Sequence, residues 1–178
     1  MAKIRKWVAY RRLERPYTRV SKYRKKAYIR ITPNIKIARF NMGNTKKTFP
    51  IHLHLISKED LQIRQNALDA ARMTCNKLLE STLTPNNYHL LIRTYPHHVL
   101  RENPLASGAG ADRMSTGMSA AFGKPIGMAA RVRKGDEIFT VGVENDAAIK
   151  TASEALRKAR TKLPKGCTII IDRTENKK

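Results

Sequence analysis

The sequence contains few cysteines and few aromatic residues. Its two cysteines, Cys75 and Cys167, lie far apart and form no CxxC pair. Neither a disulfide framework nor a zinc site is therefore expected, and both thiols should be reduced and buried. Aromatic residues make up only 6% of the chain, so aliphatic side chains must supply most of its core.

Long apolar runs are also missing. No stretch approaches the roughly 20 consecutive apolar residues that cross a bilayer. The start, Met1-Ala-Lys-Ile-Arg-Lys6, is basic and has no apolar segment behind it, so no secretory signal peptide is expected. These absences predict a soluble protein of the cytoplasm, without a membrane partner.

Acidic residues are scarce, and the imbalance is uneven along the chain. Lysine and arginine outnumber acidic residues by 36 to 14, which leaves a net charge of +22 on 178 residues. Residues 1–50 hold 16 of these cations against one acid, Glu14, whereas residues 51–178 hold 20 against 13. Such a charge opposes compaction and favours a polyanionic partner. The length fits one domain with an appended arm.

Tyrosines are interleaved with the cations of the first segment, at Tyr10, Tyr17, Tyr23 and Tyr28. Arginine binds phosphate through two parallel hydrogen bonds, and tyrosine stacks on bases exposed in RNA loops. A solvated tail or a nuclear localisation signal is the alternative, but this segment is too apolar for a simple tail. The residues expected to contact RNA, here and in later basic positions, are Lys3, Arg5, Lys6, Arg11, Arg12, Arg15, Tyr17, Arg19, Lys22, Tyr23, Arg24, Lys25, Lys26, Lys46, Lys47 and Lys124.

Hydrophobic periodicity predicts short strands followed by a long helix. Strands are expected at 27–31, 35–40 and 49–56, with a turn at 32–34 and a loop at 41–44. Ser57 is a plausible N-cap for the helix, and Glu59 and Asp60 would favour the positive end of its dipole. The apolar stripe of that helix would consist of Leu61, Leu68, Ala71, Cys75 and Leu78.

The second half of the chain also contains strand and helix patterns. Residues 88–95 read as a strand, 127–133 and 137–143 as a hairpin, and 167–172 as a final strand; a second helix is capped by Asn145 or Asp146. Together they predict an α+β fold, a two-layer sandwich of antiparallel strands with two packed helices and a basic N-terminal extension. The expected division is an RNA-binding extension at 1–26, a domain at 27–172 and a tail at 173–178.

Residues 103–125 fit neither helix nor strand, because they contain four glycines and two prolines without a period. A loop this long is usually functional or disordered. It could be a flexible lid, a disordered insertion or a probe whose small residues approach a ligand closely. Arg101, Arg113 and Lys124 would hold a probe near phosphate, but composition leaves these alternatives open.

Signals for catalysis are weak. Gly108-Ala-Gly110-Ala-Asp-Arg113 is half of a dinucleotide fingerprint, and Gly123-Lys124-Pro125 lacks the hydroxyl residue of a phosphate-binding loop. Histidines occur in pairs, as His52 with His54 and His97 with His98, without a third ligand nearby. They are interpreted as surface or RNA-facing residues. We therefore expect no enzyme activity, no metal and no cofactor.

The stretch Gly110–Pro125, ADRMSTGMSAAFGK between its ends, closely resembles the signature of a universal large-subunit ribosomal protein family. Bacteria call it L-sixteen; archaea and eukaryotes call it L-ten-e. The opening Arg11–Arg19 and the Ile-Thr-Pro-Asn stretch at 31–34 are also similar to that family. The chain resembles the archaeal form, since eukaryotic relatives carry a longer C-terminal extension.

The resemblance implies a hammerhead-like α+β fold and a structural role in the large ribosomal subunit. Members lie near the peptidyl transferase centre, bind large-subunit (23S-type) rRNA and help position tRNA acceptor arms. Their partners would be that rRNA, 5S rRNA as a further candidate, tRNA and neighbouring ribosomal proteins, without homo-oligomers. By the same resemblance, the residues closest to tRNA would be Ser107, Gly108, Gly110, Asp112, Arg113 and Met114.

Two rival functions are weighed against this one. A free RNA-binding regulator or RNA-modifying enzyme would reuse the same basic surface, but an enzyme needs a catalytic constellation that the sequence lacks. A membrane-surface or calmodulin-target protein needs a clean amphipathic helix, and Pro16 interrupts the basic segment.

Overall fold

The computed structural model describes residues 4–18, 23, 25, 29, 32–104, 106, 108–115, 117–118, 122–164 and 166–173. In chain order the elements are η1 (Trp7–Tyr10), β1 (Asn41–Gly43), β2 (Ile51–Ser57), β3 (Leu61–Arg64), α1 (Gln65–Thr82), η3 (Pro85–Asn87), β4 (Tyr88–Ile92), β5 (His98–Glu102), α2 (Ala111–Met114), β6 (Lys124–Val132), β7 (Glu137–Val143), α3 (Asp146–Arg160) and β8 (Cys167–Arg173).

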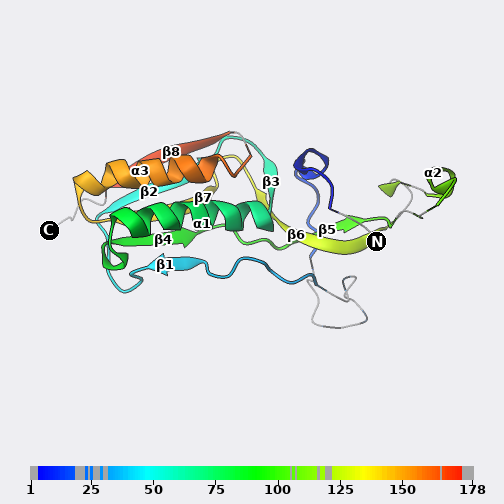
Figure 1. Cartoon of the computed structure of the whole chain (residues 1–178), viewed down its shortest axis with the longest axis horizontal. Helices are drawn as coiled ribbons and strands as arrows, with labels where there is room; N and C mark the ends of the chain where they lie inside the picture. The colour runs from blue at the N-terminus through cyan, green and yellow to red at the C-terminus, as the bar shows by residue number, and fades with distance from the viewer. Residues whose placement is uncertain are drawn as a thin grey trace.

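A five-stranded antiparallel sheet carries the main core, with strand order β1-β4-β7-β2-β8. Leu53 of β2 lies opposite Val141 of β7 and Ile171 of β8, so alternate residues of neighbouring strands share one face. Helices α1 and α3 pack against each other and cover this face (Figure 1). The α+β prediction, with antiparallel strands and two packed helices, is thereby confirmed.

Small apolar residues let the two helices approach closely. In α1, Leu68, Ala71, Cys75 and Leu79 recur at intervals of three or four and are fully buried. The buried residues of α3 are Ala148, Ala152, Ala155, Leu156 and Ala159. Each leucine removed from water here stabilises the fold by roughly 1.5–3 kcal/mol.

Both cysteines are free and buried, as the sequence predicts. Desolvation by burial raises the pKa of Cys75 to about 12. Burial likewise raises the pKa of Cys167. Both side chains therefore stay thiols at neutral pH and act as small apolar core residues.

A second, three-stranded sheet extends away from the helix pair, in the order β3-β6-β5. Figure 1 shows β5 and β6 running toward α2, which lies at the end of the molecule remote from α1 and α3. The N-terminal 3-10 helix η1 lies beside this smaller sheet.

The predicted start of the first helix is wrong. Strand β2 continues to Ser57, β3 follows, and α1 begins only at Gln65. The Ser57 hydroxyl bonds to the Glu59 carbonyl at 2.7 Å rather than capping a helix. Asp60 instead accepts a hydrogen bond from the backbone N–H of Lys134. Leu61, expected on the helix stripe, enters the same core from β3.

The predicted hairpin of 127–133 with 137–143 is also wrong. Strand β6 pairs with β3 and β5, whereas β7 pairs with β2 and β4 in the other sheet. The turn between them therefore carries the chain from one sheet to the other. It does so beside Ser57, which donates to Asp136 O at 3.0 Å and accepts from Gly135 N at 2.9 Å. Those bonds tie the two crossings, β2 to β3 and β6 to β7, at one point.

Several shorter predictions are revised. Residues 35–40 form no strand, because the Lys36 N–H donates to the Gln65 side chain instead of to a neighbouring strand. The expected loop at 41–44 contains β1, and β5 was not predicted. Residues 103–125 contain α2 and the start of β6. The strand expected at 27–31 lies, except for Ile29, outside the described residues.

Candidate nucleic-acid interface

The N-terminal segment, residues 4–18, crosses both outer edges of the smaller sheet. On β3, the Gln62 N–H donates to Arg11 O at 3.2 Å. On β5, the Val99 N–H donates to Tyr17 O at 2.9 Å. Exposed edge strands are a liability because their unpaired backbone groups recruit other strands. The segment therefore provides a backbone hydrogen-bond partner at each outer edge while it spans the sheet. These contacts do not show a separate extension.

Gln62 anchors the segment at its centre. Its side-chain Nε2 donates to the carbonyls of Tyr10, at 3.1 Å, and Arg12. The backbone carbonyl of Gln62 accepts a hydrogen bond from Trp7 Nε1 at 3.0 Å. Gln62 is fully buried, and its amide nitrogen finds two acceptors, whereas its Oε1 has no hydrogen-bond partner among the described residues. In the sequence, Gln62 is a polar residue between the buried apolar residues Leu61 and Ile63 of β3, and it was not predicted to be an anchor.

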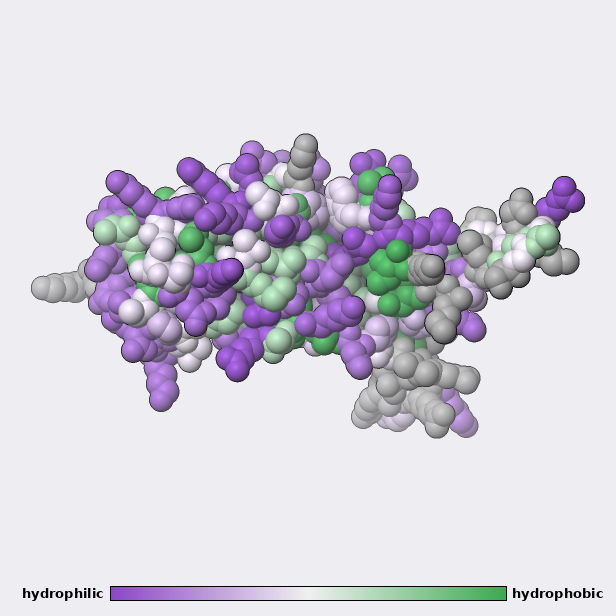
Figure 2. Space-filling view, viewed as in Figure 1, coloured by the Kyte–Doolittle hydropathy of each residue, from purple (hydrophilic) through white to green (hydrophobic). Residues whose placement is uncertain are grey.

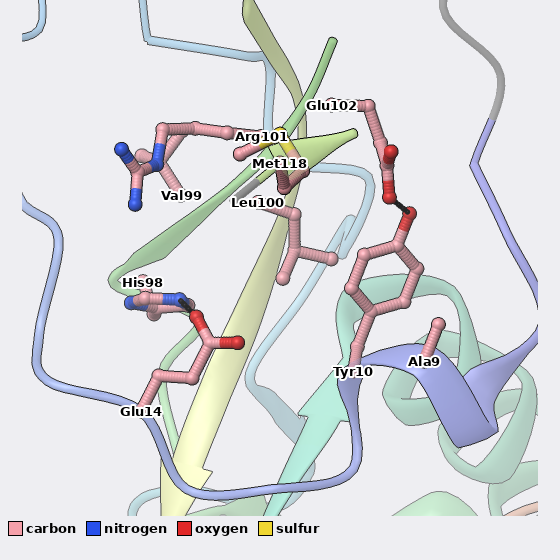
Figure 3. Close-up of a pocket in the computed structure, with 9 residues that line it drawn as sticks. All are labelled: Ala9, Tyr10, Glu14, His98, Val99, Leu100, Arg101, Glu102 and Met118. Atoms are coloured by element: carbon pink, nitrogen blue, oxygen red, sulfur yellow. Dashed lines mark hydrogen bonds and ion pairs between the residues drawn. The ribbon is translucent and has the colours of Figure 1, made fainter. Parts of the chain in front are cut away.

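A second anchor is the buried carboxylate of Glu102 on β5. The Tyr10 hydroxyl donates to Glu102 Oε1 at 2.7 Å, and Arg5 Nε lies 3.1 Å from Oε2 (Figure 3). Desolvation by burial raises the pKa of Tyr10, and the neighbouring Glu102 raises it further. Tyr10 therefore remains a phenol and can donate.

His98 provides the third anchor. The backbone N–H of Tyr17 donates to His98 Nδ1 at 3.0 Å. Desolvation lowers the pKa of His98 to about 4, with further lowering by Arg131 and Arg101. The ring is therefore neutral and carries its proton on Nε2, which lies 3.7 Å from Glu14 Oε2. With a neutral imidazole this contact is a weak polar one and not an ion pair.

A cavity of about 300 Å³ separates the N-terminal segment from β5. Figure 3 shows Tyr10 and Glu102 paired on one side and His98 facing Glu14 on the other. Its lining is Ala9, Tyr10, Glu14, His98, Val99, Leu100, Arg101, Glu102 and Met118. Because its carboxylates and histidine already face protein partners, the cavity offers no free general acid or base.

The histidine prediction is wrong for two residues. His54 and His98 are buried rather than at the surface, whereas His97 is exposed. His54 Nδ1 lies 3.1 Å from Thr140 Oγ1 and 3.1 Å from Glu137 Oε2. Among the described residues no group of three or more His, Cys, Asp or Glu could hold a metal.

The backbone of the N-terminal segment faces the sheet while its cations face water. The carbonyl of Arg5 accepts from Arg64, and that of Glu14 accepts from Arg131. Lys6, Arg11, Arg12 and Arg15 are all exposed. A row of charged side chains is thus held in a fixed register by bonds made through the main chain.

The other predicted RNA-binding residues are distributed over the molecule. Lys46 and Lys47 follow β1 of the larger sheet, away from the N-terminal segment. Lys47 Nζ lies 2.6 Å from Glu144 Oε2. Lys124 opens β6 opposite Glu102, close to the glycine-rich loop. Tyr23 and Lys25 are exposed. Outside the described residues lie Lys3, Arg19, Lys22, Arg24 and Lys26.

The expected tRNA-proximal loop includes the short helix α2. Gly108 and Gly110 have positive φ values of 131° and 75°, which only glycine adopts freely, and nothing lies within 4 Å of an added Cβ at either. Arg113 is exposed. Ser107 lies outside the described residues, as do the side chains of Asp112 and Met114. The Ala106 N–H donates to Ser115 Oγ at 3.1 Å and closes the loop.

One cationic surface was not among the predicted residues. The last turn of α3 exposes Arg157, Lys158 and Arg160, and Lys162 is exposed just after the helix. The signal in the sequence is the basic polar face of an amphipathic helix, whose cations also suit the negative end of the helix dipole. Figure 2 shows hydrophilic side chains over much of the face formed by α1 and α3.

In the described part of the chain, no helix is both long and apolar enough to cross a membrane. The surface charge makes the basic surfaces the main candidates for function.

Comparison with known proteins identifies the class to which these features belong. The family described as Ribosomal protein L16p/L10e matches residues 18–170. A protein called large ribosomal subunit protein uL16, from Archaeoglobus fulgidus, is 47% identical over 164 residues, 92% of this chain and 90% of its own length.

Its namesake from Methanococcus maripaludis is 45% identical over 162 residues, 91% of this chain and 90% of its own length. Both organisms are archaea, in agreement with the expected archaeal form. The predictions of a ribosomal structural protein, and not an enzyme, are confirmed by the family. The chain belongs to the ribosomal protein L16p/L10e family.

Proposed function

We propose that this protein is a constituent of the large ribosomal subunit that binds large-subunit rRNA near the peptidyl transferase centre and helps position tRNA acceptor arms. The relatives bear the name of a large-subunit protein. Neighbouring ribosomal proteins and 5S rRNA are further proposed partners.

The outward row of cations carries this proposal. Arg11 and Arg12 point to water while the carbonyls of both residues are bonded to Gln62, so their spacing is set before RNA arrives. Preorganised donors lose less entropy on binding. Phosphate contacts position a protein without specifying sequence, so this row supports attachment to rRNA rather than the choice of site.

The glycine-rich loop supports the tRNA part of the proposal. It lies at the end of the molecule remote from the helix pair and beyond β5 and β6 (Figure 1). Open space surrounds Gly108 and Gly110, so a nucleic-acid backbone could approach them closely. The separate role proposed for 1–26 as an RNA-binding extension rests on its charge.

The test is the triple substitution of Arg11, Arg12 and Arg15 by Ala, measured as the salt dependence of binding to large-subunit rRNA. Each lost phosphate contact should reduce the slope of log K against log salt by about one. The matched control replaces Arg157, Lys158 and Arg160 of α3 by Ala, which removes the same charge from a different surface.

An unchanged slope in the triple variant, or an equal loss in the control, would contradict docking through the N-terminal row. Large subunits purified from the source cells should also contain the chain. Its absence from that fraction would overturn the proposal as a whole.

A further inference from the structure

A cluster of two aromatic rings and one guanidinium lies where the N-terminal segment, β5 and the end of the glycine-rich loop meet. The Arg101 guanidinium carbon lies 4.2 Å from the centroid of the Tyr17 ring and 4.7 Å from that of Phe122. The two rings meet edge to face, with centroids 5.5 Å apart. Both distances from the Arg101 guanidinium to a ring centroid are within the range of cation–π contact.

Backbone hydrogen bonds hold each member of the cluster in place. Tyr17 is bonded on both sides of its backbone, to His98 Nδ1 and to Val99 N. Arg101 donates to the Phe122 carbonyl at 3.0 Å, which holds the loop end against β5. In Figure 3 the Arg101 side chain leaves β5 on the side opposite Glu102, so it is not drawn into the buried Glu102 pair.

Gly123 makes the close packing of this cluster possible. A Cβ at Gly123 would lie 3.1 Å from Arg101 Cβ and 2.9 Å from Met118 Cε, and its φ is +75°. A side chain there would push the loop end away from β5. The position of Phe122 is therefore set by backbone geometry as well as by its own ring.

The exposure of Phe122 is not explained by the fold. Phe122 is 60% exposed although it is apolar and its ring contacts Arg101 and Tyr17. A core would bury such a ring, and a solvated loop would leave it unfixed. An ordered, exposed aromatic ring beside a cation is the arrangement that proteins use to stack unpaired nucleobases.

We propose that Phe122, Arg101 and Tyr17 form a platform on which one unpaired RNA base stacks. The free area of the Phe122 ring receives the base, and Arg101 adds cation–π attraction and a positive charge for the adjoining phosphate. The platform rests on the proposed RNA-binding function and adds a specific requirement to it: the RNA must present a single-stranded nucleotide at this place.

Charge favours RNA over an acidic peptide as the occupant. A planar base uses the face of Phe122 and its phosphate uses the charge of Arg101, whereas an acidic side chain would use only the charge. Of the nearby carboxylates, Glu102 is buried and bonded to Arg5 and Tyr10, and Glu14 points toward His98 (Figure 3). Neither carboxylate makes a contact with Arg101 that would compete with the phosphate.

The experiment compares full-length Phe122→Leu, Phe122→Trp and the unaltered protein. Probes are a single-stranded RNA carrying 2-aminopurine and a blunt duplex RNA of equal length. Phe122→Leu should weaken single-strand binding about 5- to 100-fold and abolish quenching of 2-aminopurine, since it removes one stacked base. Phe122→Trp should retain both single-strand binding and quenching, and duplex binding should be equal in all three proteins.

Two further variants separate stacking from charge and from general surface effects. Arg101→Lys keeps the charge but loses the planar group, so it should reduce quenching. Tyr95→Leu, at an exposed aromatic that stacks on Phe40 instead, is the matched control and should bind like the unaltered protein. Because Phe122 is largely exposed, its replacement should leave thermal unfolding nearly unchanged.

Equal single-strand binding by Phe122→Leu and the unaltered protein, or equal loss in Tyr95→Leu, would overturn the platform. So would quenching that survives in Phe122→Leu. If the unaltered protein bound neither RNA, the proposed function itself would fail. If it bound both with a normal salt slope but Phe122 had no effect, only the platform would fail.

Discussion

At the residue scale, a few buried polar side chains fix the basic N-terminal segment against the smaller sheet. Gln62, Glu102 and His98 each hold a different point of residues 4–18. A typical hydrogen bond contributes only about 0.5–1.5 kcal/mol net, but leaving a buried partner unpaired costs about 1–3 kcal/mol. The anchors therefore matter chiefly through what their loss would leave unsatisfied.

The first residue-scale prediction concerns pH. The pKa of His98 lies below its ordinary value in the folded chain, so the unfolded chain binds more protons as the solution is acidified. The stability contributed by neutral His98 should be complete above about pH 6.5 and lost as pH falls toward 4. Thermal or urea unfolding from pH 7.5 to 4 measures it.

Two variants isolate this effect from other titrating groups. His98→Asn should flatten the dependence on pH between 6.5 and 4, since its amide does not titrate. The matched control, His97→Asn, changes an exposed neighbour and should keep the dependence of the unaltered protein. Identical curves for the two variants would contradict the role assigned to His98.

At the element scale, the described residues between 106 and 115 in the glycine-rich loop bond to one another. Its base closes through Ala106 and Ser115, and its inner turns bond within the loop, from Ala111 to Gly108 and from Arg113 to Gly110. Between 106 and 115, the residues whose side chains the structure describes are exposed or half-buried, and none of them belongs to the main core.

Deletion of residues 106–115 should therefore leave the fold nearly intact. We expect a change of less than about 1 kcal/mol in the free energy of unfolding, because little apolar surface is lost. Steps that depend on tRNA should slow in reconstituted ribosomes, measured as tRNA binding and peptide-bond formation. A same-length replacement by Gly and Ser is the control for chain length.

A deletion that unfolds the isolated protein would show that the loop is structural. Normal tRNA-dependent rates in correctly assembled subunits would contradict its role as a probe.

At the scale of the whole molecule, the two sheet crossings join the smaller sheet to the larger one, and the N-terminal segment is bonded to the smaller sheet. The segment covers the outer edges of β3 and β5, and Ser57 ties the crossings together. Removal of residues 1–18 would expose both edges and leave Gln62 and Glu102 without several partners. A basic segment would then prove necessary for folding as well as for binding RNA.

We expect that truncation to destabilise the free protein by several kcal/mol, about 1–3 for each buried group left unpaired. Amide hydrogen exchange without RNA is the measurement. The amides of Gln62 and Val99 should be protected in the full chain and exchange faster in the truncated one. Rapid exchange of both amides in the full chain would show instead that the segment orders only on RNA.

The sequence by itself determined the class of the protein. Charge indicated a polyanionic partner, the stretch at 110–125 indicated the family, and periods of two and near four gave β2, β4 and α3 close to their true positions. These signals are local, because they depend on residue type and spacing along one element. Cys75 and Cys167 were predicted correctly for the same reason.

Only the tertiary structure decided how strands were shared between sheets and what the basic segment did. The pattern of two strands with a turn is the same whether they pair with each other or, like β6 and β7, cross between sheets. The start of α1 was missed because Ser57 satisfies its backbone through Gly135 and Asp136, distant in sequence. The Tyr17–Arg101–Phe122 platform likewise joins three segments, so no local pattern could reveal it.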